Sequence, residues 1–225
     1  MNHKILHKLE SIIHDNPGLL CDKKLLEKTI NCEFGVDILV SDPKNIAEIV
    51  NAIDVKVLSR YFSEVWQPET KKFKYSGLAL IDEVNKLNPK KVLDAGCGYN
   101  EFKEKINNLV GIDPYNKHAD IQVSITDYRP KEKFDVVLAL GSINFGSTSK
   151  IFSELEHVVN LCNPGGVLFF RVNPGLQHTP PESRWISFYP WDSNFVINCA
   201  RELGVEILDL RNDSKNRMYF VWRKK

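Results

Sequence analysis

The feature that most constrains the fold is a series of short apolar runs, separated by helical stretches, that begins after Pro89. Runs such as VVLAL at 136–140 and VLFF at 167–170 show no alternation of polar and apolar residues, which is typical of strands buried on both faces. Strands are predicted at residues 91–95, 109–112, 121–124, 134–140, 166–172, 205–210 and 218–223. Helices are predicted between several of them, at 101–107, 149–161 and 193–203.

Strands that are buried on both faces must be covered by helices on both sides. The sequence therefore predicts an α/β fold with a seven-stranded, mostly parallel sheet. The last two strands lie close together at the chain end, which favours an antiparallel pair at one edge.

The first 60 residues have a helical pattern instead. Asn16-Pro17-Gly18 predicts the end of a first helix, Asp22 predicts the N-cap of a second, and Ser41-Asp42-Pro43 predicts the start of a third. We therefore predict a helical N-terminal appendage at residues 1–66, acting as a lid or in oligomerisation. An α/β domain is predicted at residues 67–225.

Composition narrows the class of protein. The chain has 30 basic and 29 acidic residues, so its overall charge does not favour nucleic acid or an anionic membrane as a partner. An odd number of cysteines, five, without paired spacing indicates free thiols. The charged N-terminus does not resemble a signal peptide, and no apolar run approaches the roughly 18 residues of a membrane span. These features predict a cytoplasmic protein, and His3 and His7 lack the further ligands that would indicate a metal site.

The stretch VLDAGCGYN at 92–100 places a carboxylate, Asp94, at the end of the first strand and glycines at 96 and 98 in the turn that follows. Such glycines permit positive φ angles and let a ligand approach the backbone closely. A dinucleotide-binding turn would have a small residue at position 101, but Glu101 stands there, where it would repel a pyrophosphate. The turn therefore disfavours a nicotinamide-dependent oxidoreductase.

Further strand ends carry acids and open backbone. Asp113 ends the second strand, where an acid typically accepts hydrogen bonds from two ribose hydroxyls. Asp127 follows the third predicted strand and is expected either to accept from the exocyclic amine of an adenine or to cap a short turn. Leu140-Gly141-Ser142 makes an open turn after the fourth strand. Together these strand ends fit a ligand with a ribose, an adenine and a cationic end, but no phosphate.

The run from Val92 to Gly175 resembles the class I S-adenosylmethionine-dependent methyltransferases. The matching segments are VLDAGCG, GID at 111–113, SITD at 124–127, FDVVLALGSINF at 134–145 and LCNPGGVLFF at 161–170. The family often has Glu at the place of Asp94 and a third glycine at the place of Asn100, and asparagine is the next best residue for a left-handed turn. The resemblance implies a Rossmann-like fold, transferase activity and S-adenosyl-L-methionine as the cofactor.

The resemblance also implies cofactor-binding residues. Asp94, Gly96, Cys97 and Gly98 would line the methionine and ribose portion, Asp113 would hold the ribose hydroxyls, Pro114 and Tyr115 would flank the adenine, Asp127 and Tyr128 would lie at its amine, and Leu140, Gly141 and Ser142 would contact the methionine end. Cys97 is expected to pack in this loop rather than act as a nucleophile, since no His or Cys stands near it.

A long aromatic segment, RVNPGLQHTPPESRWISFYPWDSNF at 171–195, follows the fifth predicted strand. Two interpretations stand: its aromatic and cationic residues wall a substrate pocket, or its aromatic residues tuck the loop onto the sheet. By residue type alone, His178, Glu182 and Tyr189 are the candidates for a general base.

The acceptor is the least constrained part of the prediction. The segment ALGSINF lacks the Asn-Pro-Pro-Tyr sequence of enzymes that methylate amino groups of DNA and glutamine, and the Pro-Cys of cytosine C5 enzymes. A small-molecule acceptor is therefore expected, with protein or RNA behind it. A non-catalytic module that binds S-adenosylmethionine or S-adenosylhomocysteine is the alternative from another class.

Overall fold

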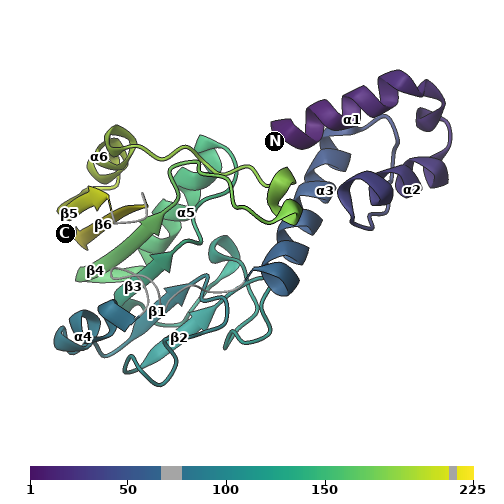
Figure 1. The fold of residues 1–225 in the computed structure, drawn as a ribbon. Helices are drawn as coiled ribbons and strands as arrows, with labels where there is room; N and C mark the ends of the chain where they lie inside the picture. Colours follow the sequence, from purple (N-terminus) through teal and green to yellow (C-terminus); the bar gives the residue numbers. More distant parts are fainter. Residues whose placement is uncertain (67–77, 213–216) are drawn as a thin grey trace. The chain divides into compact units, whose positions relative to one another are not determined.

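The computed structural model describes residues 1–66, 78–212 and 217–225 (Figure 1). The chain divides into two compact units. The helical unit comprises Met1–Trp66 and Gln177–Ser187, and the sheet unit comprises Gln67–Leu176 and Phe188–Lys225. Within the described ranges, no helix combines the length and the apolar composition that crossing a membrane requires.

The helical unit is built from helices α1, α2 and α3 and three short helical segments. Their bounds are α1 His3–Asp15, η1 Pro17–Leu20, α2 Lys23–Phe34, α3 Ile46–Arg60, η2 Tyr61–Val65 and η5 Pro181–Trp185. Each of the three helices buries apolar side chains. Those that are 0% exposed include Ile5 and Leu9 of α1, Leu26 and Ile30 of α2, and Ile53 of α3.

Capping residues explain where these helices begin. Asp22 caps α2 as predicted, because its Oδ1 accepts a hydrogen bond from the Leu25 N–H at 3.0 Å. The predicted start of the third helix at Ser41-Asp42-Pro43 is wrong. Asp42 instead accepts from the Lys44 N–H at 2.9 Å in a local turn, and Asn45 caps α3.

The segment at 177–187 forms part of the helical unit although it is far from it in sequence. The Asn2 side chain donates to the Trp185 carbonyl at 2.7 Å, and the Lys4 ammonium donates to the Ile186 carbonyl at 3.0 Å. The rings of Phe34 and Trp185 lie 4.8 Å apart. The aromatic segment predicted as a single loop is thus divided between the two units.

The sheet unit contains one sheet with strand order β2-β1-β3-β4-β6-β5. The strands are β1 Val92–Ala95, β2 Leu109–Ile112, β3 Phe134–Leu140, β4 Cys162–Val172, β5 Val205–Asn212 and β6 Met218–Lys224. β2, β1, β3 and β4 pair in parallel, while β6 runs antiparallel to both β4 and β5. The predicted antiparallel pair at the chain end is confirmed.

Helices cover both faces of this sheet, which explains the absence of alternation in its strands. On one face, Leu93 and Val137 pack with residues of α5 Thr148–Leu161 and α6 Ser193–Glu202. On the other, Val92 and Val136 pack with residues of α4 Leu78–Lys86. The α/β prediction is therefore confirmed.

Two predicted elements of the sheet unit are wrong, and the described residues form six strands rather than seven. Residues 121–124 make only a single bridge, between Ile112 and Ile121, and Ile121 is 43% exposed. That run buries too little apolar surface to hold a strand. Residues 101–107 form turns rather than a helix, because Asn100, Glu104 and Asn108 adopt positive φ angles. The sheet is also only partly parallel, since β6 breaks the pattern.

Candidate functional site

The candidate site lies where β1, β2 and β3 end side by side. The N–H groups of Gly96 and Cys97 donate to the Ile112 carbonyl at 2.8 and 2.9 Å, which ties the turn after β1 to the end of β2. The Ser142 hydroxyl donates to the Ala95 carbonyl at 2.5 Å and ties in the end of β3. The strand order changes direction at β1, with β2 on one side and β3 on the other, and ligands of open α/β sheets bind at such a point.

Gly96 is required where the turn after β1 meets the turn after β3, for two reasons. Its φ of +82° lies in the left-handed region, and a Cβ built on it would stand 2.2 Å from the Cβ of Ser142. A side chain at position 96 would therefore force the turn after β1 and the turn after β3 apart. The glycine therefore allows the turn after β1 to pack directly against Ser142 of the turn after β3.

Asp94 places a carboxylate at the end of β1, beneath these two turns. It is 3% exposed, and no residue in the described ranges donates a hydrogen bond to it. Burial, and next the charge of Asp113, raises the pKa of the Asp94 carboxyl to about 7. An unpaired buried carboxylate is unfavourable on its own, and a cationic ligand would offset that cost.

Asp113 accepts hydrogen bonds from three backbone N–H groups. Its Oδ2 accepts from the Gly98 N–H at 3.1 Å, and its Oδ1 accepts from the N–H groups of Tyr115 and Asn116 at 2.8 and 2.9 Å. The carboxylate thereby joins the turn after β1 to the turn after β2. Since a carboxylate oxygen has two lone pairs, Oδ2 keeps one for a hydroxyl group.

The other predicted residues lie at varying depths around these two acids. Cys97 is half-buried, and burial, followed by the charges of Asp94 and Asp113, raises the pKa of its thiol, as expected of a packing residue. Beyond the second strand, Pro114 is exposed and Tyr115 is half-buried.

Asp127 and Tyr128 are less suited to a ligand than the strand ends. Asp127 is exposed, and its Oδ2 accepts from the Ser124 hydroxyl while its N–H donates back to that oxygen at 3.2 Å. This is the local capping role that was one of the two expectations for Asp127. The Tyr128 ring is buried in the core, 6.3 Å from that of Phe134.

The turn after β3 is held by a residue that the sequence did not single out. Leu140, Gly141 and Ser142 are half-buried, and Gly141 has a φ of +103°. The side chain of Asn144, 3% exposed, donates to the Gly141 carbonyl at 2.7 Å and accepts from the Asn173 N–H at 2.8 Å. An asparagine four residues after the end of the buried apolar strand β3 was the available signal.

Comparisons with known proteins connect this geometry to solved structures. No family model matches the chain, and no curated protein matches it. Among solved structures, the 1,6-didemethyltoxoflavin-N1-methyltransferase of Burkholderia thailandensis, with bound 1,6-didemethyltoxoflavin and S-adenosylhomocysteine, has a TM-score of 0.60 at 16% identity, over 84% of this chain and 93% of that one. The magnesium protoporphyrin IX methyltransferase of Synechocystis PCC 6803, with bound S-adenosylmethionine, has a TM-score of 0.51 at 13% identity, over 91% and 97%. The chain has the class I methyltransferase fold.

A third structure with this methyltransferase fold extends the comparison. The sugar N-methyltransferase of Streptoalloteichus has a TM-score of 0.52 at 14% identity, over 66% of this chain and 87% of that one. The strand ends that gather Asp94, Gly96 and Asp113 are therefore those of a class I methyltransferase sheet, as the sequence resemblance implied.

The candidate general bases fall in different units of the methyltransferase fold. His178 and Glu182 belong to the helical unit, and Tyr189 belongs to the sheet unit. Nδ1 of His178 lies 2.9 Å from the hydroxyl of Tyr61, a residue 117 positions away that the sequence did not indicate. Burial, and next the charge of Glu182, raises the pKa of the Tyr61 hydroxyl. The structure thus brings Tyr61, His178 and Glu182 together.

Tyr189 is held by the sheet unit instead. Its N–H donates to the Asn144 carbonyl at 2.7 Å, and its hydroxyl lies 3.4 Å from that of Thr148. The neighbouring Trp191 is 3% exposed, and its indole N–H donates to the Ile143 carbonyl at 3.1 Å. This half of the aromatic segment is anchored to the turn after β3.

Proposed function

We propose that this protein transfers a methyl group from S-adenosylmethionine to a small-molecule acceptor. The observation that carries the proposal is the pair of acids at neighbouring strand ends, Asp94 and Asp113, beside a turn opened by Gly96. The neighbours with this fold, which include enzymes named for toxoflavin, porphyrin and sugar acceptors, support the same class.

The charges of the site select a cation over a phosphate. Asp94 is buried beside Asp113, so a pyrophosphate at this turn would meet like charges in a medium of low dielectric constant. S-adenosylmethionine carries no phosphate, and its sulfonium and ammonium groups are cations. The same argument disfavours the pyrophosphate of a nicotinamide dinucleotide, which Glu101 would also repel.

Each residue near the turn has a proposed part in holding the cofactor. Asp94 would face the cationic methionine portion, and the remaining lone pair of Asp113 Oδ2 would accept from a ribose hydroxyl. Asp127 would reach the adenine amine with its second carboxylate oxygen. The backbone from Leu140 to Ser142 would contact the methionine end.

The cofactor, when bound, supplies a methyl group on a sulfonium, which an acceptor atom attacks as the carbon–sulfur bond breaks. What the chain contributes is alignment of the acceptor and exclusion of water. If the acceptor must lose a proton first, His178, Glu182 and Tyr189 are the proposed bases. The helical unit is proposed to act as a lid or in oligomerisation.

Calorimetric titration of the purified protein with S-adenosylhomocysteine and with NAD tests the cofactor. We expect saturable binding of S-adenosylhomocysteine and none of NAD, and the reverse result would overturn the proposal. A screen of small molecules, proteins and RNA for methyl transfer from labelled S-adenosylmethionine then tests the acceptor. Binding without transfer to any acceptor would favour the non-catalytic module, and transfer to RNA or protein alone would contradict a small-molecule acceptor.

A further inference from the structure

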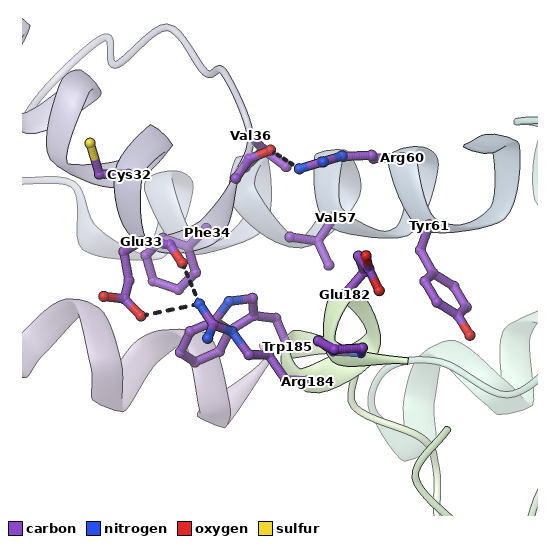
Figure 2. Close-up of a pocket in the computed structure, with 12 residues that line it drawn as sticks. Cys32, Glu33, Phe34, Val36, Val57, Arg60, Tyr61, Glu182, Arg184 and Trp185 are labelled. Carbon is purple, nitrogen blue, oxygen red and sulfur yellow. Dashed lines mark hydrogen bonds and ion pairs between the residues drawn. The ribbon is translucent and has the colours of Figure 1, made fainter. Parts of the chain in front are cut away.

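The helical unit contains a pocket of its own, about 230 Å³ in volume. It is lined by the end of α2, the end of α3 and the η5 segment (Figure 2). Phe34, Val57, Tyr61 and Trp185 provide apolar and aromatic surface. The volume lies below the roughly 300–1,000 Å³ of pockets for drug-sized ligands, so a compact molecule fits it.

Two cations that line the pocket are satisfied by the protein itself. The Arg184 guanidinium donates to the Glu33 carbonyl at 2.8 Å, lies 3.6 Å from the Glu33 carboxylate and stands over the Trp185 ring at 4.8 Å. The Arg60 guanidinium donates to the Gly35 carbonyl at 2.5 Å and lies 3.6 Å from Glu64. Both cations therefore have partners within the unit.

Glu182 is an exposed acid of the same pocket and has no such partner among the described residues. Figure 2 shows Glu182 between Trp185 and Tyr61, away from the pair formed by Glu33 and Arg184. Among the residues that the structure describes, none forms a hydrogen bond or an ion pair with the Glu182 carboxylate. Its effect on the Tyr61 hydroxyl places the charge near that ring. The uncompensated charge of the pocket is thus negative and lies beside aromatic surface.

We propose that this pocket binds a small organic amine, with its ammonium group beside Glu182 and its apolar body against Val57 and Trp185. A carboxylate next to an aromatic ring favours a cation through both its charge and the electron-rich ring face.

The binding step is tested with the full-length protein and two probes of similar shape and opposite charge, phenethylamine and 3-phenylpropionate. Affinities are measured by calorimetry, and the indole N–H signal of Trp185 is followed by NMR and assigned with Trp185→Phe. We expect phenethylamine to bind saturably, at least tenfold more tightly than 3-phenylpropionate, and to shift that signal. Glu182→Gln should weaken phenethylamine about fivefold, the upper value for an exposed ion pair. Glu182→Lys should reverse the preference.

Glu10→Gln is the matched control, because Glu10 is an exposed acid on α1 of the same unit. Equal loss in both glutamine variants, equal or tighter binding of 3-phenylpropionate by the unmodified protein, or no saturable binding of phenethylamine would each overturn the proposal. Titration with S-adenosylhomocysteine is run on the same samples. A protein that binds phenethylamine but not S-adenosylhomocysteine would keep the pocket and refute the methyltransferase function, and the opposite pattern would refute the pocket alone.

Discussion

Replacing Asp94 with asparagine is expected to stabilise the ligand-free protein above neutral pH. The Asp94 carboxyl has a pKa of about 7 in the folded protein, against a reference value of 3.8. The folded state therefore binds this proton more tightly than the unfolded state does. The stability that the protonated carboxyl permits is fully present below about pH 4 and is lost as the pH rises to about 7. Asparagine carries no charge and removes this dependence.

The magnitude follows from the difference between those two pKa values. At about 1.4 kcal/mol per unit, the step from 3.8 to about 7 corresponds to about 4 kcal/mol of unfolding free energy at pH 8. Urea unfolding of the ligand-free protein at pH 5, 6, 7 and 8 measures the part lost above pH 5, which is about 3 kcal/mol. The unmodified protein should lose stability across this series. The Asp94→Asn protein should lose about half as much, because burial also raises the pKa of the Glu154 carboxyl to about 7 and that group keeps its own dependence.

Glu206→Gln provides the control, because Glu206 is an exposed acid on β5 of the same unit. It should leave the pH dependence of the unmodified protein in place. Saturating S-adenosylhomocysteine, whose ammonium would pair with Asp94, should stabilise the unmodified protein at pH 8 more than the variant. Parallel stability curves for the unmodified and Asp94→Asn proteins between pH 5 and 8 would refute the view that this carboxylate is buried without a partner.

Three further perturbations test the rest of the site. Asp113→Ala should weaken the binding of S-adenosylhomocysteine at least about tenfold in calorimetry, and it should lower the melting temperature because three backbone N–H groups lose their acceptor. Unchanged affinity in a folded variant would contradict this. Gly96→Ala should abolish binding through its clash with Ser142, whereas Gly204→Ala, which also has a positive φ but open space around it, should leave affinity unchanged; equal effects would refute the close approach. Deleting the N-terminal helices should make residues 177–187 sensitive to limited proteolysis and should reduce turnover, while S-adenosylhomocysteine still binds. Normal turnover would refute a role as a lid, and a changed solution mass would indicate a role in oligomerisation.

The parts of the fold that the sequence predicted depend on short-range patterns. An uninterrupted apolar run such as that of β3 indicates burial on both faces wherever it lies in the chain, and Asp22 can cap α2 because its acceptor and donor are three residues apart. The candidate site could be predicted from the sequence for a related reason. Parallel strands end at the same edge of a sheet, so Asp94 and Asp113 had to come close once both were placed at strand ends.

The two wrong predictions concern runs whose composition favours a strand or a helix but whose backbone contacts prevent it. Residues 121–124 have a strand-like composition, but the turn at Asp120 binds back to Gly111 and leaves Ile121 a single bridge. The run 101–107 has helical composition, but positive φ angles at Asn100 and Glu104 keep the chain in turns. Neither backbone constraint can be read from the side chains of the run itself.

The sequence by itself determined the six strands of the sheet and the helices α5 and α6, together with the glycine turn and the acids at the strand ends. Each of these depends on residues that are neighbours in the chain. Only the tertiary structure decided that residues 177–187 pack with the N-terminal helices, so that His178 meets Tyr61 across 117 positions and Glu182 lines a pocket with Trp185. It also decided that Asp113 binds three backbone N–H groups as well as facing the site. The physical reason is that such contacts depend on the direction of each side chain after distant segments have packed, and hydrophobic periodicity carries no record of which partner a buried face will meet.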